Sequence, residues 1–162
     1  MNNLLSNEEL VMLRVVAELL EASLINSEDV QRLSEIIALL EPGRFSLNDL
    51  LENQHAIQLT AGYYQSYLKS KLRGVQGEID KRYYVQYNYM NDGKKASEAR
   101  VRAALRESAP YMVLLEQERQ LKYFVDQMSE LHSACLTRAQ MLQHLSNNAR
   151  LQARLDKEDT DE

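Results

Sequence analysis

The stretch KRYYVQYNYMNDGKK, from Lys81 to Lys95, brings together four tyrosines and four basic residues and ends in a turn signal. Its tyrosines alternate with other residues over Tyr83–Tyr89, which also fits a β-strand. The residues Asn91–Gly93 suit a hairpin turn, but the alanine-rich segment that follows does not alternate and supplies no partner strand. We therefore expect a helix that ends in a turn, with a strand over Tyr83–Tyr89 as the open alternative.

Helical periodicity extends outward from this stretch in both directions. No proline occurs between Pro42 and Pro110, and apolar residues at helical spacing predict one helix from Leu47 to Met90. After the turn, a short basic helix is expected over Ala96–Arg106, and Pro110 suits the first position of a last long helix. Three glycines interrupt the long helix and weaken it by roughly 1 kcal/mol each, so bends or close helix approaches are expected there: Gly62, Gly74 and Gly77.

The last helix carries an apolar stripe with steps of three, four and seven residues, which favours a coiled-coil-like seam. The acidic end from Asp156 lacks apolar residues, and we expect it to be disordered. The stripe consists of Leu114, Leu121, Phe124, Met128, Leu131, Cys135, Leu142, Leu145 and Ala149.

The first 45 residues predict a separate pair of short helices. Apolar residues recur every three or four positions, and Asn26 or Ser27 is expected to cap the second helix. The predicted stripe of the first helix is Leu10, Leu13, Val16, Ala17, Leu20 and Leu24. The predicted fold is all-α: a long antiparallel helical hairpin with a coiled-coil-like C-terminal helix, plus a short N-terminal helical hairpin. The expected segments are an acidic hairpin over 1–45, a helical domain with a basic turn over 46–155, and a tail over 156–162.

The composition excludes several classes of protein. The chain has 162 residues, 44% of them hydrophobic, but only 5 glycines and 2 prolines, which suits helices. A lone cysteine, Cys135, cannot form an internal disulfide, and the opening residues lack a secretory pattern, so a cytoplasmic protein is expected. No uncharged apolar stretch approaches the length of about 18 residues that a membrane span needs.

Charge is unevenly distributed along the chain, whose net charge is −5. Residues 63–106 hold ten basic and four acidic side chains, whereas the flanking parts carry net charges of −7 and −4. Such asymmetry is expected where one surface meets phosphate, although a solvated, charge-balanced helix surface explains it equally well.

No catalytic constellation is apparent, so we expect neither an enzyme nor a bound cofactor. The chain lacks a glycine-rich phosphate loop. His132 and Cys135 lie three residues apart on one helical face, but two ligands do not make a zinc site. A packed cysteine beside a half-exposed histidine is the simpler interpretation.

The basic, tyrosine-rich segment favours single-stranded nucleic acid. Cationic side chains neutralise phosphates, and aromatic faces stack unpaired bases at about 1–3 kcal/mol per base. The alternative is that most of these tyrosines are core residues with hydroxyls that reach the surface. The predicted DNA-binding residues are Lys81, Arg82, Lys94, Lys95, Arg100 and Arg102 for phosphates, and Tyr84 or Tyr87 for bases.

Three stretches in this order resemble the bacteriophage recombination mediators of the UvsY type, over roughly Leu47–Leu155. They are KRYYVQYNYMNDGKK; RESAPYMVLLEQERQLKYFVDQMSEL, a proline-started helix with a paired aromatic at Tyr123 and Phe124; and LTRAQMLQHL. The resemblance implies a protein of DNA recombination and repair that binds single-stranded DNA and forms a homo-oligomeric ring. Such a protein helps load a strand-exchange recombinase onto DNA covered by a single-stranded-DNA-binding protein.

By this resemblance, the C-terminal helix makes the oligomer, through Phe124, Met128, Leu131, Cys135, Leu142 and Leu145. The acidic hairpin at the N-terminus has no counterpart in the family. The rival hypothesis is a non-enzymatic helical scaffold or assembly chaperone that binds protein partners through the acidic hairpin and the seam.

Overall fold

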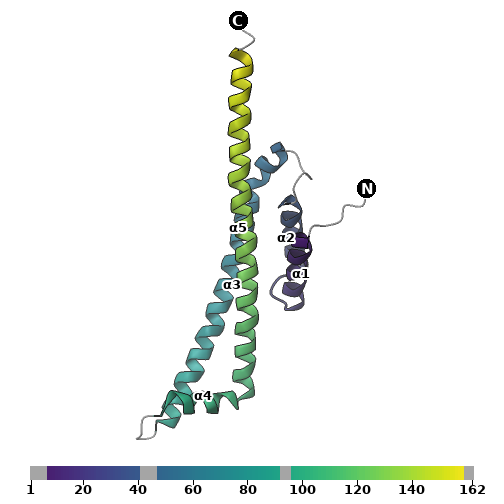
Figure 1. The fold of residues 1–162 in the computed structure, drawn as a ribbon. Helices are drawn as coiled ribbons and strands as arrows, with labels where there is room; N and C mark the ends of the chain where they lie inside the picture. Colours follow the sequence, from purple (N-terminus) through teal and green to yellow (C-terminus); the bar gives the residue numbers. More distant parts are fainter. Residues whose placement is uncertain (1–6, 41–46, 92–95, 159–162) are drawn as a thin grey trace. The chain divides into compact units, whose positions relative to one another are not determined.

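The computed structural model describes residues 7–40, 47–91 and 96–158, which form helices and no strand (Figure 1). The predicted all-α fold is confirmed. Tyr83–Tyr89 lies inside a helix, so the helical interpretation of the tyrosine-rich stretch is the correct one. The helices are α1 (Asn7–Glu21), α2 (Ser27–Leu40), α3 (Leu47–Met90), α4 (Glu98–Arg106) and α5 (Ala109–Glu158).

The connection between α1 and α2 is closed by two capping arrangements. At the end of α1, Ser23 adopts a left-handed conformation with φ of 54°, and the Leu24 N–H donates to the Leu19 carbonyl at 3.0 Å. This pattern satisfies carbonyls that the helix end leaves without partners. At the start of α2, the Asn26 side chain accepts from the Asp29 N–H at 2.9 Å, and the Asp29 carboxylate accepts from the Asn26 N–H at 3.0 Å. Of the two predicted caps, Asn26 is therefore the one used.

Helices α4 and α5 begin close to their predicted positions. Ser97 caps α4 and accepts from the Arg100 N–H at 3.4 Å, so α4 starts at Glu98 rather than at Ala96. The Ser108 carbonyl accepts from the N–H groups of Tyr111 and Met112, which places Pro110 in the first turn of α5 but not at its first residue. Pro110 is compatible with this position because the first-turn N–H groups have no intrahelical partners.

The predicted disordered tail is wrong for its first three residues, because α5 continues from Asp156 through Glu158. Adding residues to an existing helix avoids the nucleation cost, so a polar extension of a long helix needs no packing partner to form. The remaining four residues of the predicted tail lie outside the described residues.

The chain divides into two compact units. Unit 1 comprises Met1–Tyr64 and Gln127–Glu162, and unit 2 comprises Gln65–Asp126. Within each unit, one segment of α3 and one segment of α5 run in opposite directions (Figure 1). The units cut across the predicted segments 1–45 and 46–155, because the N-terminal hairpin groups with the first part of α3 and the last part of α5.

Unit 1 has a core built from all four of its helical segments. The Tyr64 hydroxyl of α3 donates to the Asp29 carboxylate of α2, which ties the hairpin to the long helix. Gly62 of α3 lies close to α5, because a Cβ built at this glycine would be 3.5 Å from the His132 Nε2 atom. The buried apolar side chains include Val15, Val16, Leu19, Leu33, Ile36, Ile37, Ile57, Ala61, Met128, Leu131, Cys135, Ala139 and Leu142.

Unit 2 contains a core cluster centred on α4. Three buried side chains, Val101, Leu105 and Tyr111, form this cluster, and partly buried residues of α3 and α5 pack around them. Other buried apolar residues of this unit are Leu68, Leu121, Phe124 and Val125. In Figure 1, α4 crosses between the last turns of α3 and the first turns of α5. A short helix thus closes one end of unit 2 and brings its polar face beside the tyrosine-rich part of α3.

Candidate nucleic-acid interface

Positive charge is concentrated in unit 2. Its sequence holds twelve basic and eight acidic residues, a net charge of +4, whereas unit 1 holds seven basic and sixteen acidic residues, a net charge of −9. The boundary between the compact units therefore coincides with a change in the sign of the charge. Long-range attraction of a polyanion would act on unit 2 rather than on the chain as a whole.

Two of the predicted phosphate ligands lie next to each other on α3. Lys81 and Arg82 are both exposed, and the Lys81 ammonium is 3.8 Å from the Glu78 carboxylate. In the part of the chain that the structure describes, Arg82 has no ion-pair partner. An exposed pair such as Lys81 and Glu78 contributes little to stability, so a phosphate can replace the carboxylate at small cost.

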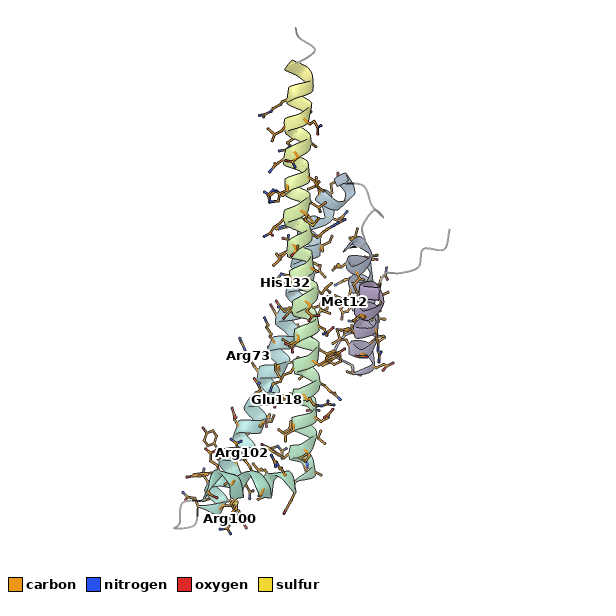
Figure 2. The ribbon with its side chains drawn as sticks, in the orientation of Figure 1. Met12, Arg73, Arg100, Arg102, Glu118 and His132 are labelled. Carbon is orange, nitrogen blue, oxygen red and sulfur yellow. The ribbon has the colours of Figure 1, made fainter. Side chains whose placement is uncertain are left out.

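The other two predicted arginines within the described residues lie on α4. Figure 2 labels both of them, at the end of unit 2 where α4 begins. Arg100 is exposed and has no ion-pair partner among the residues 96–158, whereas the Arg102 guanidinium lies 3.6 Å from the Glu98 carboxylate one turn earlier. Lys94 and Lys95, which were predicted to flank the turn, lie outside the described residues.

The two predicted base-stacking tyrosines have different environments. Tyr84 is 65% exposed and meets the neighbouring Tyr83 edge-on, with ring centroids 6.0 Å apart. Tyr87 is half-buried, stacks on Tyr83 at 6.3 Å, and packs against the core of unit 2. Tyr84 can therefore offer a face to a base, whereas Tyr87 is a packing residue.

Tyr89 was not among the tyrosines predicted to stack on bases, although this side chain is 82% exposed. It follows Arg82 by seven residues, which is two helical turns, so both side chains lie on the same face of α3. Because Tyr83–Tyr89 is helical, this spacing places the Tyr89 ring on the same face as the Arg82 guanidinium, which has no ion-pair partner among the described residues. The signal was present in the sequence but was obscured by the alternation of the tyrosines.

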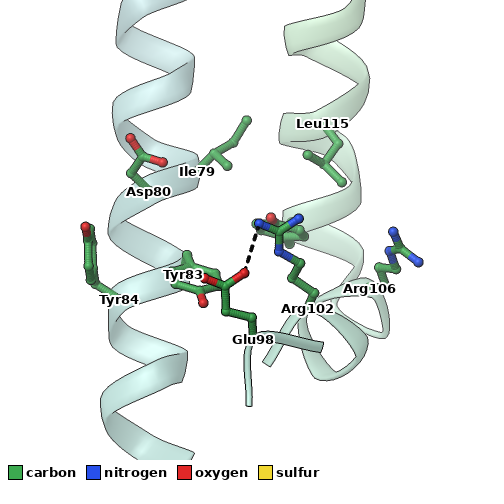
Figure 3. A pocket seen from close by; sticks show the side chains of 9 residues that line it. Ile79, Asp80, Tyr83, Tyr84, Glu98, Arg102, Arg106 and Leu115 are labelled. Carbon is green, nitrogen blue, oxygen red and sulfur yellow. Dashed lines mark ion pairs between the residues drawn. The ribbon is translucent and has the colours of Figure 1, made fainter. Parts of the chain in front are cut away.

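A pocket of about 450 Å³ opens beside these residues, between α3, α4 and the first turns of α5 (Figure 3). An ion pair between Glu98 and Arg102 lies in it, and Tyr84 and Arg106 lie towards opposite edges in this view. Partial burial, followed by the nearby Glu98 carboxylate, raises the pKa of Tyr83. The full lining is Ile79, Asp80, Tyr83, Tyr84, Glu98, Arg102, Arg106, Tyr111 and Leu115.

The residues predicted to form the oligomer are mostly buried within a single chain. Phe124, Met128, Leu131, Cys135 and Leu142 all belong to the buried core, and only Leu145 is exposed, at 52%. A side chain that is already buried in the protomer has no apolar surface left for a second copy. Leu145 is thus the one predicted interface residue that can contact a partner without rearrangement.

The pair His132 and Cys135 does not form part of a larger ligand set. Cys135 is buried, and this burial raises the pKa of its thiol to about 11, so it is neither a thiolate nucleophile nor a ready metal ligand at neutral pH. No group of three histidine, cysteine, aspartate or glutamate side chains is placed to bind a metal within the described residues. Similarly, none of the described helices contains an apolar stretch that would cover the thickness of a bilayer.

Comparison of the chain with models of protein families, with curated proteins and with solved structures found no match. The resemblance to UvsY-type mediators therefore stays a prediction from the three sequence stretches.

Proposed function

We propose that this protein is a non-enzymatic accessory protein that binds single-stranded DNA through unit 2. The observation that carries the proposal is the separation of charge: unit 2 has a net charge of +4 in a chain of −5. Its exposed Arg82 and Arg100 lack ion-pair partners among the described residues. Guanidinium groups that are not engaged within the protein can contact phosphates without first breaking an internal pair.

The mechanism is one of positioning. Phosphates contact Arg82 and Arg100, and also Lys81 and Arg102 once their weak exposed pairs exchange, while bases stack on Tyr84 and Tyr89. In a duplex the bases are already stacked on each other, so exposed tyrosine faces favour an unpaired strand. Lys94 and Lys95 join this set on the basis of the sequence alone.

The resemblance to recombination mediators supports a more specific role within this proposal. The protein would hold a DNA strand in a shape that a strand-exchange recombinase accepts, on DNA covered by a single-stranded-DNA-binding protein. A ring of several copies would present the same modest patch repeatedly to one strand and raise its effective concentration. The native mass of the purified protein would give the number of copies.

Exposed apolar side chains on the last part of α5 favour assembly, whether as a homo-oligomer or in the rival role of a helical scaffold. Met141, Leu145 and Leu151 are all exposed there. The two roles differ in whether DNA is bound. If the protein binds no unpaired oligonucleotide even at low salt, the scaffold is the better account.

A charge-matched pair of variants tests the DNA-binding surface. In one variant Arg82→Gln and Arg100→Gln are combined; in the control Arg150→Gln and Arg154→Gln remove the same charge from exposed positions of unit 1. Anisotropy of a labelled single-stranded oligonucleotide is measured over a series of salt concentrations. Loss of two phosphate contacts should reduce the slope of log affinity against log salt by about 1.4, with no change in the control. Equal slopes in the two variants would contradict the proposal.

A further inference from the structure

The pocket of unit 2 contains acidic groups that a surface for phosphates alone would not need. Asp80 and Glu98 both line it, and a carboxylate close to a phosphate is repelled. Glu98 is accounted for, because it pairs with Arg102 and lies in the first turn of α4. Asp80 is exposed and has no ion-pair or hydrogen-bond partner within the described ranges, so its carboxylate is available to accept a hydrogen bond from a ligand in the pocket.

Arg106 is similarly uncommitted. It lies in the last turn of α4, lines the same pocket, and has no ion-pair partner in the described part of the chain. In Figure 3 its guanidinium lies towards the opposite edge of the pocket from Tyr84, with the Glu98–Arg102 ion pair between them. The pocket thus offers a hydrogen-bond acceptor beside an aromatic ring at one edge and a cationic donor at the other.

The size and lining of the pocket suit a planar ring with a polar edge. A volume of about 450 Å³ falls within the range of roughly 300–1,000 Å³ that is typical of small-molecule sites. Three tyrosines, Tyr83, Tyr84 and Tyr111, supply aromatic surface, while Ile79 and Leu115 supply apolar surface. Proteins that read unpaired bases combine the same elements, namely aromatic stacking and hydrogen bonds to the base edge.

We propose that this pocket takes one unpaired nucleobase that bears an exocyclic amino group, from the strand bound to unit 2. The base stacks on Tyr84, its amino group donates to the Asp80 carboxylate, and Arg106 binds a phosphate of the same strand. This inference rests on the proposed function, since it concerns the same strand. Thymine has no exocyclic amine, so it would leave Asp80 desolvated without a donor from that group. In a duplex the amino groups are paired, which excludes them from the pocket.

The test compares binding of oligo(dC) and oligo(dT) of equal length at pH 8 and moderate salt. Both are pyrimidine strands with the same phosphate charge, so a difference between them reports on the base. Wild-type protein should bind oligo(dC) about tenfold more tightly than oligo(dT). In Asp80→Asn, whose carboxamide can donate as well as accept, the ratio should fall below about threefold while the salt slope stays unchanged.

Glu78→Gln is the matched control. Glu78 is an exposed carboxylate two residues away on the same helix, but it does not line the pocket. This variant removes the same charge and should tighten binding of both oligonucleotides equally, so the tenfold ratio should remain. A reduced ratio in Glu78→Gln would show that the preference depends on overall charge and would overturn the site.

The outcomes separate this inference from the proposed function. If wild-type protein binds neither oligonucleotide, both are overturned. If it binds both with equal affinity, DNA binding stands and the base pocket is overturned. If oligo(dC) is preferred but Asp80→Asn keeps the full preference, the amino group is read elsewhere and the assignment to this pocket is overturned. Only a preference that Asp80→Asn reduces to below about threefold and Glu78→Gln retains supports it.

Discussion

Tyr64 and Tyr84 lie twenty residues apart on α3, and the two units use these tyrosines in opposite ways. Tyr64 in unit 1 is 3% exposed, and its hydroxyl donates to Asp29 of the N-terminal hairpin. Tyr84 in unit 2 leaves most of its ring in solvent. Tyrosine on the same helix is thus a packing residue in unit 1 and a surface residue in unit 2. The exposure of each side chain depends on how many helices surround it.

Two pockets lined by described residues, one in each unit, show the same contrast. Between α2, α3 and α5, unit 1 has a pocket of only about 10 Å³, with room for about one water. The Arg138 Nε in this lining is buried and has no hydrogen-bond partner within the described part of the chain. The pocket of unit 2 has a volume of about 450 Å³, and charged side chains form part of its lining. We infer that unit 1 provides most of the packing energy and that unit 2 provides the binding surface.

The largest effect expected from this comparison is on the core of unit 1. Leu131→Ala removes a side chain that is 0% exposed and should lower the free energy of unfolding by about 3 kcal/mol, through lost burial and the cavity left behind. The control is Leu136→Ala on the same helix, where the side chain is 43% exposed and the expected change is within about 0.5 kcal/mol. Urea denaturation measures both. Similar losses in the two variants would show that the core is not where the structure places it.

The sequence predicted the helices better than their contacts. The limits of α3 were predictable because apolar residues recur at helical spacing from Leu47 onward and a turn signal in the sequence follows Met90. The buried face of α1 was predicted less well: Val16 is buried as expected, but Ala17 and Leu20 are exposed, and Val15 and Leu19 are buried instead. Periodicity fixes the spacing of a stripe, whereas a rotation of the helix by one position depends on the packing partner.

The candidate site was predictable only in part, for the same reason. Clustering of charge identified Arg82 and Arg100 without any structure. However, the distinction between Tyr84 and Tyr87 depends on where α4 packs. The pocket joins residues of three consecutive helices, and the periodicity of each helix does not predict how these helices pack together. Asp80 is an exposed carboxylate, and only the position of α4 shows that it lines a pocket. The seam of α5 likewise predicted apolar packing, but could not show that the chain itself covers most of it.

A smaller, pH-dependent effect is expected at the link between α2 and α3. The Asn26 N–H, and then the Tyr64 hydroxyl, lower the pKa of Asp29 from its ordinary value of 3.8. A lowered pKa means that the folded state favours the carboxylate, so this stabilisation is present above pH 3.8 and is lost as the pH falls through the folded value. Burial, and then the Asp29 carboxylate, raise the pKa of Tyr64. The stabilisation from the protonated Tyr64 hydroxyl is therefore present below the ordinary pKa of 10.0 and is lost as the pH rises through the folded value.

Asp29→Asn should therefore lower the free energy of unfolding by about 1–2 kcal/mol at pH 7 and by less at pH 3. Tyr64→Phe should cost about 1 kcal/mol at pH 7, and the double variant should cost less than the sum of the two. Glu28→Gln in the same helical turn controls for the loss of charge near the helix start. Chemical denaturation at the two pH values is measured for the wild type and the four variants. A penalty for Asp29→Asn that is equal at pH 7 and pH 3 would contradict the role of the carboxylate.

The smallest effects are expected from alanine substitutions at the glycines of α3, where the two units differ in the space around each glycine. A Cβ at Gly74 or Gly77 of unit 2 would meet nothing within 4 Å, whereas a Cβ at Gly62 of unit 1 would lie 3.5 Å from His132 Nε2. The predicted close helix approach is thus present at Gly62 and not at the other two glycines. Because alanine is favoured over glycine in a helix, Gly74→Ala and Gly77→Ala should each raise the free energy of unfolding by up to about 1 kcal/mol. Gly62→Ala is compatible with ordinary contact and should raise it by no more.

Leucine at the same positions separates the two environments. Gly74→Leu should keep the stability of Gly74→Ala to within about 0.5 kcal/mol, since the longer side chain extends into open space. Gly62→Leu should instead lose about 1–3 kcal/mol, because its additional carbons must displace the His132 ring or move α5. Thermal unfolding followed by circular dichroism measures both. If Gly74→Leu were as destabilising as Gly62→Leu, the outer face of α3 in unit 2 would be covered by another copy of the chain, and the binding surface proposed for it would have to lie elsewhere.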